Sequence, residues 1–195
     1  MSIPPAITAL LTRTTELGAL LKTWAEVNSG SRNAEGLAQI GALLKNHFVQ
    51  SFPKATVDEL PAEAAGWNPP GVKALRIRLR PQAPNQVLLC GHFDTVYEPT
   101  DPFQTCRWLD ETTLNGPGVA DMKGGIVVIL AALEAFEQTP SAEQLGWEVL
   151  LTPDEETGSH GTADLPARRV DQRLRPHARD PERHRGRDRA PAAHR

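Results

Sequence analysis

Apolar residues recur at helical spacing through the first fifty positions of the chain. Between residues 6 and 27 they repeat every three or four positions, and the pattern stops at Asn28-Ser29-Gly30. This predicts an amphipathic helix over 6–27. A second helix is predicted from a cap at Asn33 to about Gln50, with inward positions Leu37, Ile40, Leu43, Leu44 and Phe48. His47 lies on the flank of that stripe and is interpreted as an ordinary surface or packing histidine.

The middle of the chain changes from helical to strand periodicity. Residues 73–80 alternate between apolar side chains and arginines, which predicts a strand with one solvated face: Leu75, Ile77 and Leu79 against Arg76, Arg78 and Arg80. The apolar run Gln86 to Cys90 predicts a central strand, and Trp147 to Thr152 predicts another. The Pro- and Gly-rich stretch Pro61 to Gly71 is a predicted loop.

A strongly apolar helix is predicted over residues 124–137, between the two buried strands. A strand, a helix and a strand at these spacings form a βαβ unit with parallel strands. We therefore predict an α/β fold: a three-layer αβα catalytic domain around a largely parallel, mixed sheet, incomplete in this chain. In such sheets the ligand crevice lies at the carboxyl ends of the strands.

Three polar stretches follow the predicted strands and carry the candidate chemistry. They are Gly91-His92-Phe93-Asp94-Thr95-Val96, Gly116 to Gly125, and Pro153 to Ser159. Taken singly, a His-x-Asp after a strand is usually a capped turn, and a Glu-Glu pair is usually a solvated helix start. All three in order supply imidazole and carboxylate ligands suited to zinc. The ordered set predicts a metallohydrolase.

These stretches resemble the motifs of a known family. His92-Phe93-Asp94-Thr95-Val96 matches the His-x-Asp-Thr-Val motif of the co-catalytic zinc family of glutamate carboxypeptidases, aminoacylases and acetylornithine and succinyl-diaminopimelate deacylases. Gly116-Pro117-Gly118-Val119-Ala120-Asp121, followed by Lys123-Gly124-Gly125, is similar to the carboxypeptidase version of the second motif. Asp154 to Ser159 resembles the Asp-Glu-Glu-x-Gly-Ser motif. The resemblance covers roughly residues 5 to 165, the N-terminal part of such an enzyme.

The resemblance implies a role for each motif residue. His92 and Glu156 would bind the first metal, and Asp121 would bridge both metals. Asp94 would orient His92, and Glu155 would be the general base. The implied cofactor is zinc, two ions in the complete family site, with cobalt or manganese as alternatives.

The implied reaction is hydrolysis of an amide in a small peptide or N-acyl amino acid. The carboxypeptidase-like second motif favours release of a C-terminal acidic residue such as glutamate, and an acetylornithine deacetylase-like deacylase is the alternative. The family's second-metal carboxylate, downstream histidine and lid and dimerisation domain, through which it forms homodimers, are absent from this sequence. We therefore expect at most one weakly bound metal and no useful turnover.

Charge divides the chain unevenly. Residues 162–195 hold ten of the 21 basic residues and five of the 24 acidic ones, so this segment is +5 and residues 1–161 are −8. With four prolines and no aromatic residue, residues 166–195 are predicted to be a disordered Arg-rich tail. We interpret the tail as an out-of-frame translation that begins near Leu165. The alternatives are a solvated linker, or a non-catalytic remnant or binding module with a cationic tail; nucleic-acid binding is disfavoured because stacking aromatics are absent.

Cysteine usage and the N-terminus favour a cytoplasmic enzyme without membrane partners. Two cysteines, Cys90 and Cys106, do not form a disulfide framework, and Cys90 is predicted to be a buried thiol. Met1 to Pro5 lack the basic and apolar regions of a secretory signal. No stretch approaches the length needed to span a bilayer.

Overall fold

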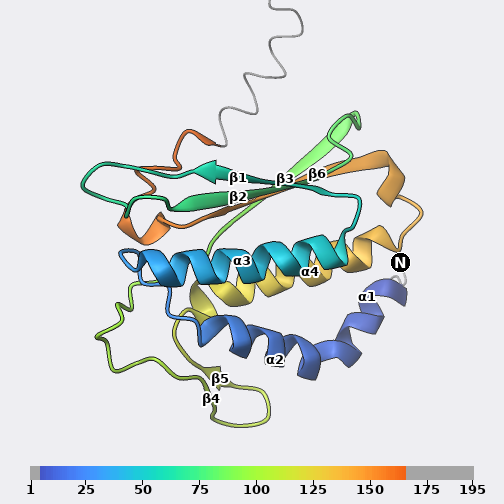
Figure 1. The fold of residues 1–195 in the computed structure, drawn as a ribbon. Coiled ribbons are helices and arrows are strands. Elements are labelled where there is room, and N and C mark those ends of the chain that lie inside the picture. Colours follow the sequence, from blue (N-terminus) through green and yellow to red (C-terminus); the bar gives the residue numbers. More distant parts are fainter. Residues whose placement is uncertain (1–4, 166–195) are drawn as a thin grey trace, which may run out of the picture. The chain divides into compact units, whose positions relative to one another are not determined.

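A mixed four-stranded sheet is the centre of the fold in the computed structural model, which describes residues 5–165 (Figure 1). The strand order is β1-β2-β6-β3; β3 and β6 are parallel, and the other two neighbouring pairs are antiparallel. A two-stranded hairpin, β4 with β5, lies outside this sheet. The strands are β1 (Thr56–Pro61), β2 (Lys73–Leu79), β3 (Asn85–His92), β4 (Arg107–Trp108), β5 (Leu114–Asn115) and β6 (Leu145–Thr152).

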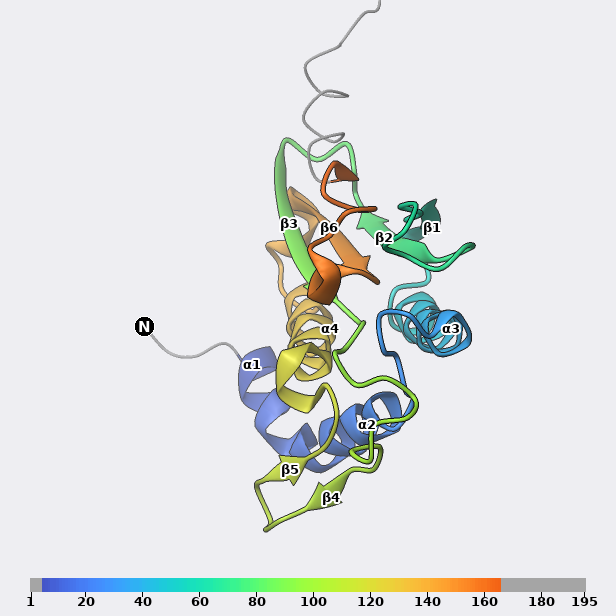
Figure 2. The same cartoon turned by 90° about the vertical axis from the view of Figure 1, so that its left-hand side faces the viewer.

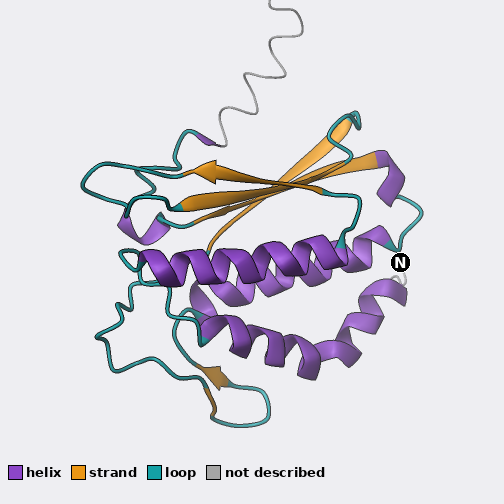
Figure 3. Cartoon of the chain, viewed as in Figure 1, coloured by secondary structure: helices purple, strands orange, loops and turns teal. Residues whose placement is uncertain are grey.

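The two longest helices cover one face of the sheet (Figure 2). α3 packs on β2 and α4 packs on β3, while α1 and α2 pack against α4 on its far side. Figure 3 shows the four-stranded sheet and the helices α1–α4 as separate layers, with the β4–β5 hairpin near α2. The helices are α1 (Pro5–Leu10), α2 (Thr14–Ala25), α3 (Ala34–Ser51) and α4 (Gly124–Glu137), with short turns η1 (Leu11–Arg13), η2 (Val119–Lys123), η3 (Ala142–Gln144) and η4 (Glu155–Thr157).

The core lies between the sheet and these helices. Alternate residues of β2 and β6 face the helices and are fully or nearly fully buried, and Phe52 at the end of α3 contacts Trp147 at a ring distance of 4.9 Å. The largest fully buried apolar side chains are Trp24, Trp147, Phe48, Phe93, Ile40, Leu44, Ile77, Ile126, Leu150, Leu151 and Val149.

The predicted α/β class and mixed sheet are confirmed. The helix predicted from Asn33 is α3, and the Asn33 side chain caps it by accepting a hydrogen bond from the backbone N–H of Gly36 at 3.1 Å. The predicted βαβ unit is β3, α4 and β6, with β3 and β6 in parallel register. The helices of residues 5–165 all lie on one face of the sheet, so the opposite helical layer is not among the described residues.

The prediction of one continuous helix over residues 6–27 is wrong. The segment is divided into α1, η1 and α2, with a break at Leu11–Arg13. The hydroxyls of Thr12 and Thr14 donate to the carbonyls of Ala9 and Leu11. Such local side-chain bonds compete with the regular helical pattern.

The three arginines predicted as a solvated face each pair with a carboxylate, but only Arg76 is buried. Arg76 is 9% exposed, and its Nε lies 3.1 Å from Oε1 of Glu148 on β6. Arg78 pairs with Asp58 at 2.5 Å, and Arg80 forms a two-pronged pair with Glu137 at the end of α4. The alternation was a correct strand signal, but Arg76 and Arg78 pair with acidic residues on neighbouring strands and Arg80 pairs with the end of α4.

Cys90 is exposed, which contradicts the predicted buried thiol. Its neighbour Gly91 approaches Met122 and Leu151 on the helix side of the sheet. Successive strand residues point to opposite faces, so Cys90 points away from the helices. Within residues 5–165, β3 is the last strand of the sheet rather than a central one.

The predictions on residues 166–195, the disordered Arg-rich tail and its out-of-frame origin, lie outside the described residues. Within residues 5–165, no helix is long and apolar enough to cross a membrane. Cys90 and Cys106 are both free thiols.

Candidate metal centre

The parallel pairing of β3 and β6 brings the first and third motifs together. His92 is in register with Thr152, and the backbone N–H of Phe93 donates to the carbonyl of Thr152 at 2.9 Å. Residues 92–94 and 153–156 therefore leave the sheet side by side at its carboxyl edge, where α/β folds place their ligands.

The second motif reaches the same edge through the turn η2, which precedes α4. Gly118 has a left-handed backbone (φ 68°), and its Cβ, if present, would lie 2.7 Å from the Thr95 side chain. Only glycine fits such a position without strain. Asp121 has extended backbone angles inside the turn (φ −128°, ψ 101°), and the Asp121–Met122 peptide bond is cis. The Asp121 carboxylate lies beside His92, with Oδ1 2.9 Å from Nε2.

Three candidate ligands converge at this point. Ligand atoms of His92, Asp121 and Glu156 all lie within 4.8 Å of one another. The His92 side chain is 6% exposed, whereas the Asp121 side chain is 76% exposed. The Glu155 carboxylate lies 3.8 Å from His92 Nε2 and is 55% exposed. One nitrogen and two carboxylate ligands are a donor set that zinc accepts, so these residues fit the ion.

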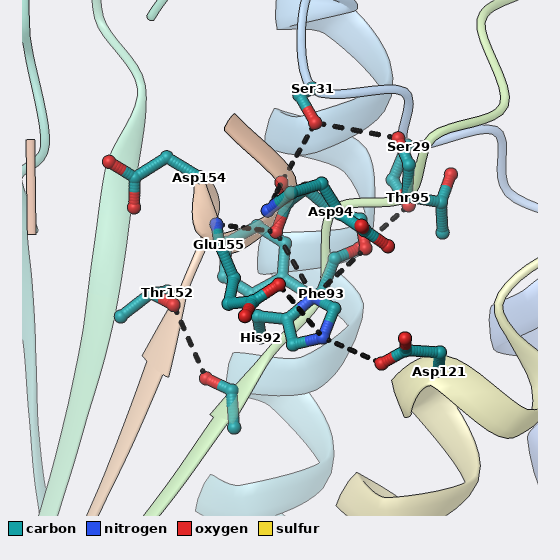
Figure 4. A network of polar contacts seen from close by, with 12 residues as sticks. Ser29, Ser31, His92, Phe93, Asp94, Thr95, Asp121, Thr152, Asp154 and Glu155 are labelled. Carbon is teal, nitrogen blue, oxygen red and sulfur yellow. Dashed lines mark hydrogen bonds and ion pairs between the residues drawn. The ribbon is translucent and has the colours of Figure 1, made fainter. Parts of the chain in front are cut away.

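Asp94 connects the groups beneath the cluster (Figure 4). It is fully buried, and each of its two oxygens has two donors. Oδ1 lies 3.2 Å from His92 Nδ1 and accepts the backbone N–H of Glu155 at 3.1 Å. Oδ2 accepts the Ser31 hydroxyl at 2.8 Å and the backbone N–H of Glu156 at 3.1 Å. One carboxylate therefore fixes the His92 ring and the backbone of the third motif together.

Asp154 anchors the other side of the third motif. It is 1% exposed and accepts from Asn68 Nδ2 at 2.9 Å, from the backbone N–H of Gly161 at 2.7 Å and from the Thr162 hydroxyl. Asn68 belongs to the loop predicted over 61–71. The loop contacts the residues after the third motif a second time, because the Trp67 ring stacks on the His160 ring at a centroid distance of 3.9 Å.

The charges around the cluster shift two pKa values. Burial alone lowers the pKa of His92, but its contacts with the Asp94 and Asp121 carboxylates and the charge of Glu155 outweigh burial and raise the pKa to about 9. Burial, together with the charges of Asp121, Asp94 and Glu155, raises the pKa of Glu156, while His92 opposes this shift.

The structure brings together all five motif residues that the sequence singled out: His92, Asp94, Asp121, Glu155 and Glu156. His47 instead faces the Leu43 carbonyl and the Trp24 ring, and His160 is exposed apart from its stack on Trp67, as surface or packing histidines do.

Ser31 was not predicted as a site residue from the sequence, and Asp154 was assigned no role. The signal at Ser31 was the polar run after the first helical stripe, which was interpreted only as a helix stop. Its partner Asp94 is 63 positions away, and no local pattern reports that distance.

Comparison with known proteins places this sequence in a family. The sequence pattern of Peptidase family M20/M25/M40 matches residues 88–189, more than half of the chain. Carboxypeptidase G2 from Pseudomonas sp. (strain RS-16) is 29% identical over 155 residues, 78% of this chain and 36% of that protein. Acetylornithine deacetylase from Proteus mirabilis (strain HI4320) is 39% identical over 83 residues, 38% of this chain and 20% of that protein.

A solved structure shares the fold. Human carnosine dipeptidase 1 superimposes with a TM-score of 0.69 at 21% identity, over 87% of this chain and 38% of that chain. The chain thus spans little more than a third of the length of these longer proteins.

Proposed function

The chain belongs to Peptidase family M20/M25/M40, and on this premise we propose that residues 92–156 form the first-metal part of a centre that hydrolyses amide bonds. The convergence of His92, Asp121 and Glu156 ligand atoms within 4.8 Å, with the Glu155 carboxylate beside them, carries the proposal. His92 and Glu156 would hold the first ion, and Asp121 would bridge it to a second. Zinc bound there would act as a Lewis acid on the substrate carbonyl and on the attacking water.

The side chains around the ligands have separate tasks. Asp94 holds the Nδ1 side of His92, so that Nε2 faces the metal position. Glu155 accepts a proton from the attacking water as the new C–O bond forms, and returns it to the leaving amine as the C–N bond breaks. Its half-exposed carboxylate can meet a substrate that enters from solvent.

Among substrates, we propose a peptide or N-acyl amino acid that releases a C-terminal acidic residue such as glutamate. The second motif, Gly116-Pro117-Gly118, supports this choice, as does the longer stretch of similarity to carboxypeptidase G2. The second candidate is an N-acyl amino acid deacylase, which the higher identity to acetylornithine deacetylase over a shorter stretch favours.

We further propose that residues 1–165 are the N-terminal part of a catalytic domain and that residues 166–195 are translated out of frame. The family match, which extends to residue 189, is an observation against the out-of-frame origin. The second-metal carboxylate and the downstream histidine would then come from outside this sequence. On this proposal the chain binds one zinc ion weakly and turns over little substrate. The homodimer and the cytoplasmic location stay predictions of the sequence analysis.

Zinc stoichiometry tests the proposal directly. The chain, loaded with zinc and freed of excess by gel filtration, should retain about one ion, and His92→Ala should retain none. Glu155→Gln should keep the ion, because Glu155 is proposed as a base and not as a ligand of the first metal. A wild-type chain without zinc, or an equal loss in Glu155→Gln, would contradict the assigned roles.

A substrate panel separates the two candidate reactions. N-acyl glutamates and N-acetylornithine would be compared with the zinc-loaded chain, with Glu155→Gln as the blank. Any hydrolysis above that blank should favour the acyl glutamates. Preference for N-acetylornithine would support the deacylase, and turnover comparable to a complete enzyme would refute the expected inactivity.

A further inference from the structure

We propose that Ser31 is a positioning residue of the metal centre, acting through Asp94 on both His92 and the third motif. The effect on metal binding rests on the proposed function; the effect on the protein's own geometry does not. Ser31 follows α2 in the chain and belongs to none of the three motifs.

The contact between Ser31 and Asp94 is short and buried. Ser31 Oγ lies 2.8 Å from Asp94 Oδ2, and the two residues are 5% and 0% exposed. The same hydroxyl has a longer contact of 3.4 Å with the Thr95 carbonyl. A serine hydroxyl has one proton to donate, and a bond to a carboxylate is stronger than one to a neutral carbonyl. The Ser31 hydroxyl therefore donates its hydrogen bond to the Asp94 carboxylate.

Loss of the Ser31 hydroxyl would change the hydrogen bonding of Asp94 and therefore the positions of the candidate metal ligands. Without the Ser31 hydroxyl, Asp94 Oδ2 would keep only the backbone N–H of Glu156 among its two donors. The other oxygen would still face His92 and the backbone of Glu155. Loss of one donor to a buried carboxylate is costly. A rotation of Asp94 that offset this cost would displace the His92 ring and the third motif together, because both are bonded to it.

Ser31 is itself held by a short parallel pairing beyond the end of β3. We call residues 28–31 the serine segment. The backbone N–H of Thr95 donates to the Ser29 carbonyl at 2.9 Å, and the N–H of Ser31 donates to the Thr95 carbonyl at 3.1 Å. Between them Gly30 passes so close to Tyr97 that a Cβ would lie 2.7 Å from its carbonyl oxygen. The serine segment is therefore fixed against residues 93–97.

The second motif holds the chain just before the serine segment. Lys123, two residues after Asp121, is 1% exposed. Its Nζ donates to the carbonyls of Trp24 and Val27, at 3.1 and 2.9 Å, at the carboxyl end of α2. A cation at this end also interacts favourably with the helix dipole. The serine segment thus connects the strand end that carries Asp94 with the turn that carries Asp121.

Ser29 provides a matched control in the same segment. Its hydroxyl is also buried and also bonds across to the residues after β3, but it donates to the Phe93 carbonyl at 2.7 Å and not to the carboxylate. Removal of either hydroxyl deletes one buried hydrogen bond from the same pairing. Only removal of the Ser31 hydroxyl deletes a donor to Asp94.

The test compares Ser31→Ala, Ser31→Thr and Ser29→Ala in the full chain. In the zinc-free protein, ¹H–¹⁵N spectra should show the backbone amides of Glu155 and Glu156 shifted in Ser31→Ala and unchanged in Ser29→Ala. Zinc affinity, measured by chelator competition, should fall about tenfold in Ser31→Ala. It should stay within about twofold of wild type in Ser29→Ala, and the hydroxyl of Ser31→Thr should restore most of the loss.

Each outcome decides a separate question. Equal effects of Ser31→Ala and Ser29→Ala on the amides and on affinity would show a merely structural hydroxyl and overturn the proposal. Unshifted amides of Glu155 and Glu156 in a folded Ser31→Ala variant would also overturn it. If the wild-type chain binds no zinc, the proposed function fails, and the amide shifts alone decide whether Ser31 positions the site.

Discussion

Zinc binding by this chain should displace a proton from His92 at neutral pH. In chelator-treated protein the contacts with Asp94 and Asp121, together with the charge of Glu155, raise the pKa of His92 to about 9 against burial. At pH 7 about 99 of 100 molecules then carry the proton. A histidine must be neutral to bind a metal, so apparent affinity at pH 7 should lie about 100-fold, or about 3 kcal/mol, below its limit at high pH.

Two measurements test this magnitude. Titration calorimetry at pH 7, in buffers of different ionisation enthalpy, should report release of about one proton per zinc ion. Chelator competition should show affinity rising about tenfold per pH unit up to about pH 9, and then levelling. His47→Gln is the matched control: it removes a histidine that faces the Leu43 carbonyl, and it should leave the slope unchanged.

The raised pKa of His92 also determines whether the zinc-free fold gains or loses stability as the pH rises. The folded pKa of His92 lies above its ordinary value of 6.5, so its protonation stabilises the zinc-free fold fully below about pH 6.5. That contribution is lost as the pH rises through about 9, and the Tm of zinc-free protein should fall over this window. Affinity that stays flat between pH 7 and 9, or calorimetry without proton release, would refute the reasoning.

Three further predictions concern stability, each measured by chemical denaturation. Asp94→Asn cannot accept all four of its donors and should cost about 2–4 kcal/mol; an unchanged midpoint would contradict its linking role. Gly36→Ala places a Cβ 1.8 Å from a backbone carbonyl oxygen and should cost more than about 2 kcal/mol, whereas Gly41→Ala, with nothing within 4 Å, should stabilise by up to about 1 kcal/mol. Arg76→Met breaks a buried ion pair and should cost about 3–5 kcal/mol, most of which Arg76→Met with Glu148→Leu should recover; equal losses would contradict the pairing.

Local sequence signals predicted the elements that frame the site. α4 was predicted with its observed bounds, because Gly124-Gly125 and an unbroken apolar run mark it in the sequence. α3 was predicted with its observed cap at Asn33, a strong capping residue, and within one residue at its end. The motifs at the ends of β3 and β6 gave the ligand cluster, since parallel neighbours bring their carboxyl ends to one edge.

The features that could not be predicted from the sequence depend on contacts between residues that are distant in the chain. The acidic partners of Arg76 and Arg80 lie on other elements, so the alternation of β2 could not distinguish paired arginines from solvated ones. The exposure of Cys90 depends on where β3 lies in the sheet and on which face lacks a helix. The role of Ser31 depends on a backbone pairing with Thr95 that involves one bridge and leaves no periodic signal.

The location of the ligand cluster within a single βαβ unit has a consequence for the order in which the site forms. His92, Asp121 and Glu156 are separated by intervals of about thirty residues, so the entropy lost in closing each loop is modest. Once β6 pairs with β3, the candidate ligands His92 and Glu156 lie side by side, and Asp121 lies on the turn before α4 that joins them. Zinc added during refolding can therefore be captured at this step, and zinc capture should report the pairing of these two strands in real time.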